Sequence, residues 1–482
     1  MPVDSRHASY EESLPAWMRA RDVLAGEDAV KAGGVRYLPR LDCQTDDEYA
    51  AYKERASFFN ATARTADGFV GLIFRREPTF KIPEKTTGVG RALAAFLEDA
   101  NMLGNSLHSY AKDVVREVMT VGRAGSLVDW EDEMEHRAYA VLYQAEQIIN
   151  WQTQRVNGRN VLTLVVLREV VAGVSGDGFK VDDHEQLRVL RLVKNSNDAS
   201  DWIYHVEIWR PKQNRTKKTN RTEWERVETR MPLRLGKPLS LIPFVFHGSR
   251  NCQECIDKLP LADIIAVNLD HYRLNADYKH GLHFTALPTA WVSGFDKASE
   301  LRIGSSTAWV AETPGATAGF LEFTGQGLTT FERAMDRDER LMAVLGSRML
   351  EPQKRAVETA DAIELRQSGE NSVLSGVSLS VSDSITQILR WVYWWNSTEE
   401  LTVALGDERI MAQLNLDFTT RGMSSTELTA VVSAWQAGAI SRESMFELLR
   451  RGEVLPAGRT NEEEAKLVGN KHRVTESAEK TK

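Results

Sequence analysis

Two long helices are predicted by the stretches IDKLPLADIIAVNLDHYRLNADYKHGLH at residues 256–283 and LTTFERAMDRDERLMAVLGSRML at residues 328–350. In the first, Pro260 fits the first turn of a helix. One face of that helix is then kept by Leu261, Ile265, Asn268 and Tyr272. The helix carries too many polar side chains to be buried all round, and we expect Gly281 and Pro288 to end it.

The second stretch repeats its apolar residues in a heptad-like rhythm. These residues are Leu328, Phe331, Met335, Met342, Leu345 and Met349, with one interruption at Asp338. Asp336–Arg340 covers the outer face with charge. Between the two helices, residues 284–325 are rich in Gly, Ser and Thr and contain strand-like segments at 307–310 and 319–323. The whole region therefore predicts two helices that flank a small αβ insert.

C-terminal to this region the pattern stays helical. Pro352 predicts a break, and residues 356–396 then form a very long helix. Its Gly- and Ser-rich middle predicts a kink between 368 and 377. Residues 424–455 predict two short helices separated at Gly438, and the charged tail after Pro456 is expected to be disordered.

The N-terminal quarter also reads as helical. Thr45-Asp-Asp-Glu48 is a capping box, and apolar residues at helical spacing extend from it to Ile73. Pro78 and Pro83 end that segment. A further helical stretch over 89–121 is expected to break at Gly104. The residues Gly122-Arg-Ala-Gly125 then predict a turn, and Ser126–Trp130 predicts a strand.

From about residue 137 to 250 the pattern changes to short β-branched or alternating runs. The predicted strands are 139–143, 161–171, 186–193 and 202–209, separated by turn residues such as Asn157-Gly158. Lys212–Arg221 is basic and polar, which is typical of a solvated hairpin tip. Helical, then β-rich, then helical segments together predict the α+β class.

Composition bounds the function. The chain has 482 residues and a net charge of −8, whereas proteins that grip nucleic acid tightly are usually basic. Its three cysteines, Cys43, Cys252 and Cys255, give no disulfide framework and indicate a reducing cytoplasm. The polar start has no signal-peptide core, and the longest apolar runs are far too short to span a bilayer.

Motifs that carry chemistry are sparse. Cys252-Gln-Glu-Cys255 has metal-ligand spacing, but no second such pair follows, and the downstream His271, His280 and His283 match no zinc signature, so we expect ordinary thiols and no metal. Acidic clusters at 131–133 and 462–464 are more typical of solvated charge than of an ion site. The chain has no Walker A, GxSxG, HExxH or strand-linked GxGxxG motif, so neither a cofactor nor catalysis is expected. The mixed charge of the second helix in 424–455 favours packing over reading DNA.

Several segments, in order along the chain, resemble the portal proteins of tailed bacteriophages, also called head-to-tail connectors. They are Pro15-Ala-Trp-Met-Arg-Ala-Arg-Asp22, Tyr37-Leu-Pro-Arg-Leu41, Tyr49–Ala56, Asn60–Thr65, Gly68-Phe-Val-Gly-Leu-Ile-Phe-Arg75, Gly122-Arg-Ala-Gly-Ser-Leu-Val-Asp129 and Ile148-Ile-Asn-Trp151. The resemblance spans residues 10–455 and depends on the order and breadth of the matches, since no single motif is diagnostic.

The resemblance implies a portal-type division of the chain. It assigns 1–255 to an α/β wing, 256–283 and 326–348 to the two stem helices, 284–325 to the clip, 349–397 to a tunnel loop and a long kinked wing helix, 398–423 to a wing strand or connector, 424–456 to a helical crown and 457–482 to a disordered charged tail. It also implies a dodecameric ring at one capsid vertex of the virion, assembled in the bacterial cytoplasm. The implied partners are double-stranded DNA passing through the channel, the terminase large subunit, tail adaptor or head-completion proteins, and the major capsid and scaffold proteins.

The segment around Pro352 is the candidate contact with that DNA. We expect residues 349–357 to form a loop facing the channel, where Gln353, Lys354 and Arg355 offer long polar side chains. An equally supported alternative is that Lys354 and Arg355 only cap a helix end. For the whole chain, the alternatives are a metal-dependent hydrolase or nuclease, which needs carboxylates converging at one site, and a virion adaptor or scaffold protein that forms no ring.

Overall fold

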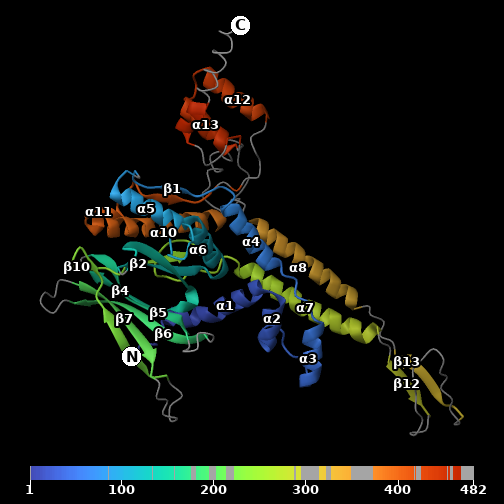
Figure 1. Ribbon diagram of the computed structural model, residues 1–482. Helices are drawn as coiled ribbons and strands as arrows, with labels where there is room; N and C mark the ends of the chain where they lie inside the picture. Colours follow the sequence, from blue (N-terminus) through green and yellow to red (C-terminus); the bar gives the residue numbers. More distant parts are fainter. Residues whose placement is uncertain are drawn as a thin grey trace. The chain divides into compact units, whose positions relative to one another are not determined.

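The computed structural model describes residues 2–84, 86–132, 134–156, 158–174, 181–194, 202–212, 222–286, 289–294, 314–321, 327–348, 373–416, 418, 425–452, 454–455 and 460–467 (Figure 1). The chain is a mixture of helices and antiparallel sheets, which agrees with the predicted α+β class at that level. It divides into two compact units. Unit 1 comprises Met1–Ser13, Asp67–Leu259 and Leu350–Lys482, and unit 2 comprises Leu14–Ala66 and Pro260–Met349.

Unit 1 is built on two sheets. A three-stranded sheet has the order β11-β2-β3, and a five-stranded sheet has the order β4-β5-β6-β7-β8. Their strands are β2 (Arg123–Glu131), β3 (Arg137–Gln144), β4 (Ile148–Val156), β5 (Arg159–Val174), β6 (Val181–Lys194), β7 (Trp202–Pro211), β8 (Trp224–Arg230) and β11 (Phe244–Gly248). Every pairing is antiparallel, so consecutive strands of the larger sheet are joined as hairpins.

One buried helix organises the core of unit 1. Helix α10 (Val373–Asn396) packs against β2, β3 and β11 and against α5 (Gly88–Glu98) and α6 (Leu107–Val121). Its apolar stripe, predicted from the sequence, is fully buried at Leu374, Val377, Val381, Ile385, Ile388 and Val392. Its serines lie inside as well, and Ser380 donates to the Gly248 carbonyl at 2.8 Å. Small hydroxyl side chains therefore let the neighbouring backbone approach this helix closely.

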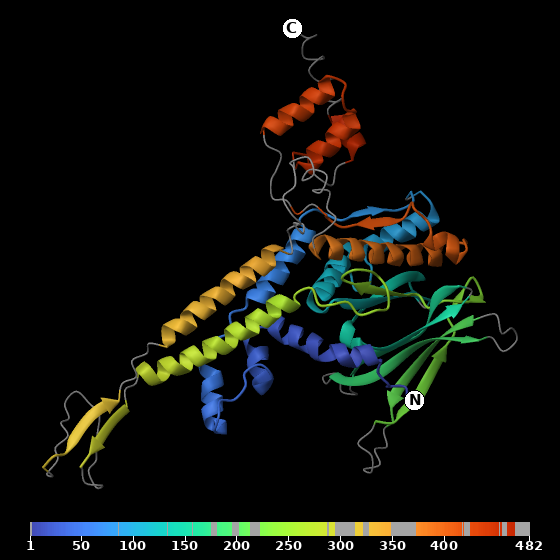
Figure 2. The same ribbon diagram turned by 180° about the vertical axis from the view of Figure 1, so that it is seen from behind.

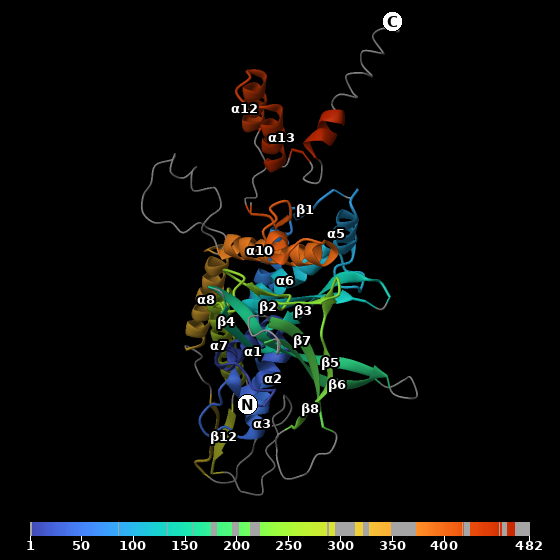
Figure 3. The ribbon, with the colours of Figure 1, turned by 90° about the vertical axis from the view of Figure 1, so that its left-hand side faces the viewer.

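The remaining elements of unit 1 are short. The strand β1 (Thr79–Lys81) pairs with β14 (Met411–Gln413), and β9 (Leu233–Arg234) pairs with β10 (Lys237–Pro238). Two short helices, η2 (Ala145–Gln147) and α11 (Leu401–Leu405), also belong to this unit. Helices α12 (Ser425–Gln436) and α13 (Arg442–Arg451) form a separate pair around Met445, Phe446 and Leu449 (Figure 3). This agrees with the predicted helix–Gly438–helix pattern, because Gly438 has φ +74°.

Unit 2 is helical with one small hairpin. It contains α2 (Glu27–Gly33), η1 (Gly34–Arg36), α3 (Asp46–Arg55), α7 (Ala262–Ala286), α8 (Leu328–Arg348) and the strands β12 (Thr289–Ser293) and β13 (Thr317–Leu321). Two helices, α1 (Ala8–Ala25) and α4 (Ala61–Ile73), contain residues of both units. None of the described helices is long and apolar enough to cross a membrane.

The structure corrects one predicted helix. Thr45 caps α3 with the predicted box, but residues 45–73 are not one helix, since the chain leaves helical geometry at Ala56 and resumes it in α4. Side chains of α7 hold the break open: the Ser57 amide donates to the Asn275 side chain, and Asn268 bonds both Phe59 and Thr62. The apolar periodicity continues across the break, and the local sign of it is Asn60, whose side chain accepts the Ala63 amide at the start of α4.

Three further predictions were wrong: those for Gly281, for Gly125 and for the start of the C-terminal tail. Gly281 does not end α7, which continues to Ala286; a Cβ at Gly281 would lie 2.8 Å from Leu328 of α8, so this glycine permits close helix packing. Gly125 lies inside β2 rather than in a turn, since only the absence of a side chain leaves room for the Phe244 ring. Residues 461–467 of the predicted disordered tail are helical, capped by Thr460 and Glu463.

Several other elements were predicted correctly, whereas helices α1 and α2 were not predicted. Helices α5, α6, α8, α12 and α13 and strands β2, β3, β5, β6 and β7 lie at the predicted positions, and Gly104 has the positive φ expected of the break between α5 and α6. The sequence did not reveal β4, β8, β11 or β12 as strands. The predicted strand at 307–310, residues 368–372 of the predicted kink and the tail beyond 467 lie outside the described residues, and residues 373–377 belong to the helix α10. The portal-type division of the chain stays a prediction, and residues 14–66, placed in the wing by that division, cluster with α7 and α8.

Candidate functional site

Helices α7 and α8 form an antiparallel arm with the β12–β13 hairpin between them in the chain (Figure 2). Three contacts fix their register: Tyr278 donates to the Glu332 carboxylate at 2.7 Å, Asn275 lies 3.9 Å from the Met335 sulfur, and His271 lies 3.4 Å from Glu339. In each contact the two residue numbers add up to 610, as expected for two antiparallel helices that pair without a shift in register.

The base of the arm is held by buried polar contacts. Tyr52 of α3 donates to Asp277 of α7 at 2.5 Å, and this carboxylate, together with burial, raises the pKa of the Tyr52 hydroxyl well above its usual range. Asn268, fully buried, accepts from the Thr62 amide and hydroxyl and donates to the Phe59 carbonyl. Buried polar groups that are satisfied in this way fix one docking geometry, because any shift would leave them without partners.

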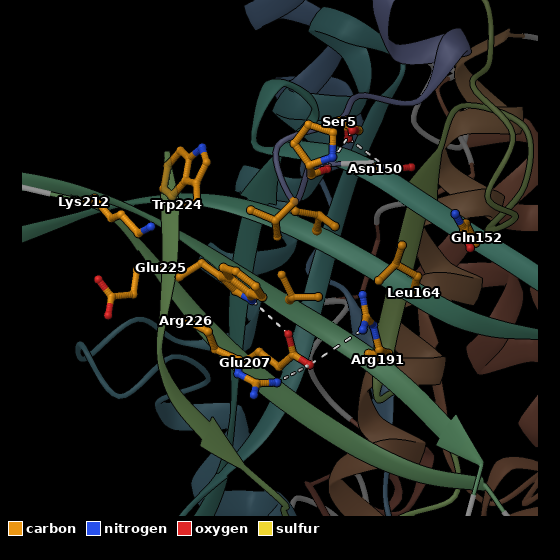
Figure 4. A pocket seen from close by; sticks show the side chains of 15 residues that line it. Ser5, Asn150, Gln152, Leu164, Arg191, Glu207, Lys212, Trp224, Glu225 and Arg226 are labelled. Carbon is orange, nitrogen blue, oxygen red and sulfur yellow. Dashed lines mark hydrogen bonds and ion pairs between the residues drawn. The ribbon is translucent and has the colours of Figure 1, made fainter. Parts of the chain in front are cut away.

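A cavity of about 820 Å³ opens on one face of the five-stranded sheet (Figure 4). Leu164, Val166 and Val189 supply apolar side chains, and the N-terminal residues Pro2–Ser5 form part of the wall. Asn150 anchors that wall by donating to the Ser5 carbonyl at 2.9 Å. The remaining lining is polar or aromatic: Gln152, Arg191, Glu207, Trp209, Lys212, Trp224, Glu225 and Arg226.

Glu207 is the polar centre of this cavity and is only 5% exposed. It accepts the Trp209 indole N–H at 2.9 Å and lies 3.9 Å from Arg191 and 3.7 Å from Arg226. Two half-exposed guanidinium groups thus share one carboxylate, so each keeps donors for another acceptor. The lining thus combines three basic side chains, Arg191, Lys212 and Arg226, with the two carboxylates Glu207 and Glu225.

The predicted chemical groups do not converge. Cys252 is partly buried, its thiol lies 3.2 Å from the Ser380 carbonyl oxygen, and burial raises the pKa of that thiol to about 12, while Cys255 is exposed. His280 lies against the Tyr52 ring, and His283 lies 3.2 Å from Arg55. Across the described part of the chain, no three His, Cys, Asp or Glu side chains are placed to hold a metal ion. Of the acidic clusters, Glu131 accepts backbone amides of the turn that follows it.

The predicted DNA-contact residues Gln353, Lys354 and Arg355 lie outside the described residues. Their assignment therefore stays a prediction.

Sequence reasoning missed two buried groups of unit 1. Arg123, read as part of a turn, is a fully buried residue of β2, and His247 is a fully buried residue of β11. A single charged residue among the small residues of Gly122-Arg-Ala-Gly125 was the available signal for the first. The alternating Phe244-Val-Phe-His247 was the signal for the second, because it indicates a strand.

His247 belongs to a hydrogen-bond chain that crosses unit 1. Its Nδ1 lies 2.7 Å from the Ser384 hydroxyl, which itself donates to the Val381 carbonyl, so Nδ1 carries the proton. Its Nε2 therefore accepts from Ser126 at 2.6 Å, and Ser126 accepts from Tyr110 at 2.6 Å. Burial lowers the pKa of His247 to about 3, so the imidazole is neutral at pH 7. The chain joins α6, β2, β11 and α10 as a structural network.

Comparisons with known proteins match a family model over part of the chain and a set of solved structures. A family model described as "Domain of unknown function (DUF4055)" matches residues 260–396, and no curated protein matches the chain. Among solved structures, chains titled "Virion of native gene transfer agent (GTA) particle", "Neck of empty GTA particle computed with C6 symmetry" and "Neck of native GTA particle computed with C12 symmetry" are similar at 12% identity and a TM-score of 0.37. Each alignment covers 88% of this chain and 98% of the other. At this TM-score the superposition is too loose to carry an argument.

Proposed function

We propose that this chain is the subunit of a phage-type portal ring, the channel for packaging and ejection of double-stranded DNA at one capsid vertex. The observation that carries the proposal is the arm. Two long antiparallel helices in register, with a small β-hairpin between them, follow the order that the sequence resemblance implies for stem, clip and stem.

The surface of the arm supports assembly with further copies. Most outward side chains of α8 are exposed, including Leu341 and Val344 at 40% and 42%. Exposed arginines beside exposed aliphatic groups are compatible with a protein interface, where Arg is enriched. A ring would cover this surface between neighbouring subunits.

A passive channel fits the charge of the chain. Each phosphate that is neutralised by Lys or Arg adds affinity for DNA, and a genome that must slide through a pore cannot be held tightly. A chain with a net charge of −8 suits that task. In this proposal the subunit is not an enzyme, and it works by shape and by binding its partners.

The proposed partners are those implied by the sequence resemblance. They are further copies of the chain in a dodecameric ring, the terminase large subunit, tail adaptor or head-completion proteins, and the major capsid and scaffold proteins. The proposed location is the portal vertex of a virion, after assembly in the bacterial cytoplasm.

Assembly of the purified full chain tests the proposal. We expect mass photometry to show a closed ring of about twelve subunits, near 650 kDa from the 54.2 kDa chain. Negative-stain images should show a ring with a central opening. Only monomers and dimers across protein and salt concentrations would contradict the proposal, and so would DNA cleavage that a point change in this chain abolishes.

The predicted loop at 349–357 gives a second test. We expect Lys354→Ala combined with Arg355→Ala to leave ring assembly unchanged and to reduce packaged DNA several-fold, because a ring repeats each modest phosphate contact in every subunit. Encapsidated DNA per particle is the measurement. Normal packaging would exclude a DNA contact for these two residues, and loss of rings would assign them to assembly.

A further inference from the structure

The outer face of α8 carries two parallel stripes of opposite charge. Arg333, Arg337 and Arg340 recur at spacings of four and three residues, so they share one helix face. Glu332, Asp336 and Glu339 repeat the same spacing one residue earlier, on the adjacent face. All six residues are exposed.

The two stripes differ in what they already contact. The acidic stripe borders α7, where Glu332 accepts from Tyr278 and Glu339 lies 3.4 Å from His271. The basic stripe lies opposite the buried face of α8 that contains Asp338 and Met342. The Arg337 side chain is 78% exposed and lies 3.6 Å from Asp338 of the same helix. The three arginines therefore present their guanidinium groups outward.

Helix α3 of unit 2 carries exposed acidic side chains as well as the basic Lys53 and Arg55. Helix α3 contacts α7 through Tyr52 and Asp277, whereas α8 contacts α7 through Tyr278, and Figures 1 and 2 show α3 and α8 on opposite sides of α7. Asp47 and Glu54 lie on the exposed face of α3, two helical turns apart. Asp46, at the start of the helix, has an 88% exposed side chain and is paired with Arg40 at 2.6 Å, so it adds less free charge to that face.

We propose that the basic stripe of α8 (Arg333, Arg337 and Arg340) docks on the acidic face of α3 (Asp46, Asp47 and Glu54) of a second copy of this chain. The inference rests on the proposed ring and names two of the surfaces that would close it. A basic face on one side of a unit and an acidic face on the other form a heterologous contact, which repeats head to tail and can close into a ring. Charge complementarity of this kind selects the partner and the register.

Two observations favour a protein partner over DNA for the basic stripe. The acidic stripe lies directly beside the arginines and would repel phosphates. Leu341 and Val344 are exposed at the C-terminal end of α8, and aliphatic contacts of this size are typical of a protein interface.

The test is a charge exchange between the two faces in the full chain. One variant combines Arg337→Glu with Arg340→Glu, and the other combines Asp47→Lys with Glu54→Lys. Each variant alone brings like charges together at every interface, so we expect the ring population in mass photometry to fall at least about ten-fold, since each exposed pair is modest but every interface loses two. Thermal melting of the Asp47→Lys, Glu54→Lys variant should match that of the native chain, because both side chains are exposed. The arginine variant also loses the pair of Arg337 with the buried Asp338, so its melting temperature is measured to separate a loss of stability from a loss of assembly.

Mixing the two variants should restore rings. In an alternating ring, the acidic α8 of the arginine variant contacts the basic α3 of the lysine variant. At every other interface, the native basic α8 of the lysine variant contacts the native acidic α3 of the arginine variant. All four substitutions in one chain should restore rings as well. A control that combines Glu98→Lys with Asp113→Lys changes the net charge as much as the second variant does, at exposed positions of α5 and α6, and should leave assembly unchanged.

The outcomes separate the two proposals. If the native chain forms rings and either double variant does so equally well, the α8–α3 contact is wrong while the ring proposal stands. Rings lost in both variants and not regained in the mixture also overturn the contact. Normal rings with several-fold weaker binding of a short DNA duplex by the arginine variant would reassign the stripe to DNA. A native chain that never assembles overturns the ring proposal and this inference together.

Discussion

Arg123→Ala is expected to lower the free energy of unfolding of unit 1 by about 3–5 kcal/mol, the range of large-to-small changes at buried positions. Arg123 is 1% exposed, and its guanidinium carbon lies 4.2 Å from the Trp151 ring centre and 4.6 Å from that of Phe246. Its Nη1 donates to the Glu254 carbonyl at 2.8 Å. Alanine would leave a cavity between two aromatic rings and remove the tie to the segment after β11.

The charge itself is costly at this position. Burial lowers the pKa of Arg123 to about 9, and its Nε and Nη2 have no hydrogen-bond partner within the described residues. Arg123→Met is the matched control, because methionine fills most of the volume without a charge. We expect Arg123→Met to recover at least half of the loss in a urea titration. If methionine were as destabilising as alanine, the charge and its hydrogen bonds, rather than the packing, would hold the site.

Acid is expected to destabilise unit 1 through His247. The unfolded chain binds a proton near pH 6.5, whereas burial lowers the pKa of His247 in the folded chain to about 3. Between these values the unfolded state binds more protons, so stability falls as the pH falls from about 6.5 towards 3. The effect amounts to about 2 kcal/mol at about pH 5 and about 5 kcal/mol at its acid limit.

His247→Gln isolates this contribution. The amide keeps a donor and an acceptor for the Ser384 and Ser126 hydroxyls but does not titrate. We expect a lower melting temperature than that of the native chain at pH 7 and a shallower decrease towards pH 4. His7 and His280, whose pKa values burial also lowers, are present in both proteins, so their contributions cancel in the comparison. Equal slopes in the two proteins would show that His247 does not drive the acid response.

The sequence alone determined the elements whose signals are local. A capping box at Thr45 predicted the start of α3, because both of its hydrogen bonds form within four residues. The apolar stripe of α10 and the heptad rhythm of α8 predicted helices, since one face of α10 is buried along its length and the apolar face of α8 is partly buried around Met342. The two helices around a small insert were predicted in the same way, and with them the arm on which the proposed function depends.

Tertiary structure alone decided the features that depend on distant residues. Asn60 gives a local signal, since its side chain accepts the Ala63 amide at the start of α4. The extended backbone before it is held by Asn268 and Asn275, more than two hundred residues later in the chain. The strands β4, β8 and β11 were not predicted. Each is stabilised as a strand by hydrogen bonds and side-chain contacts with its neighbouring strands, which its own sequence pattern does not show.

Packing between distant segments also decides where the candidate interaction surfaces lie. The stripe Arg333, Arg337 and Arg340 is visible in the sequence as helical spacing, but its outward direction depends on which face of α8 packs against α7. That the acidic face of α3 lies on the opposite side of α7 follows only from the Tyr52–Asp277 contact. Local hydrogen bonds and periodic burial can be predicted from the sequence, because they depend on residues a few positions apart. The side of the molecule on which a charge lies depends on packing between segments far apart in the chain.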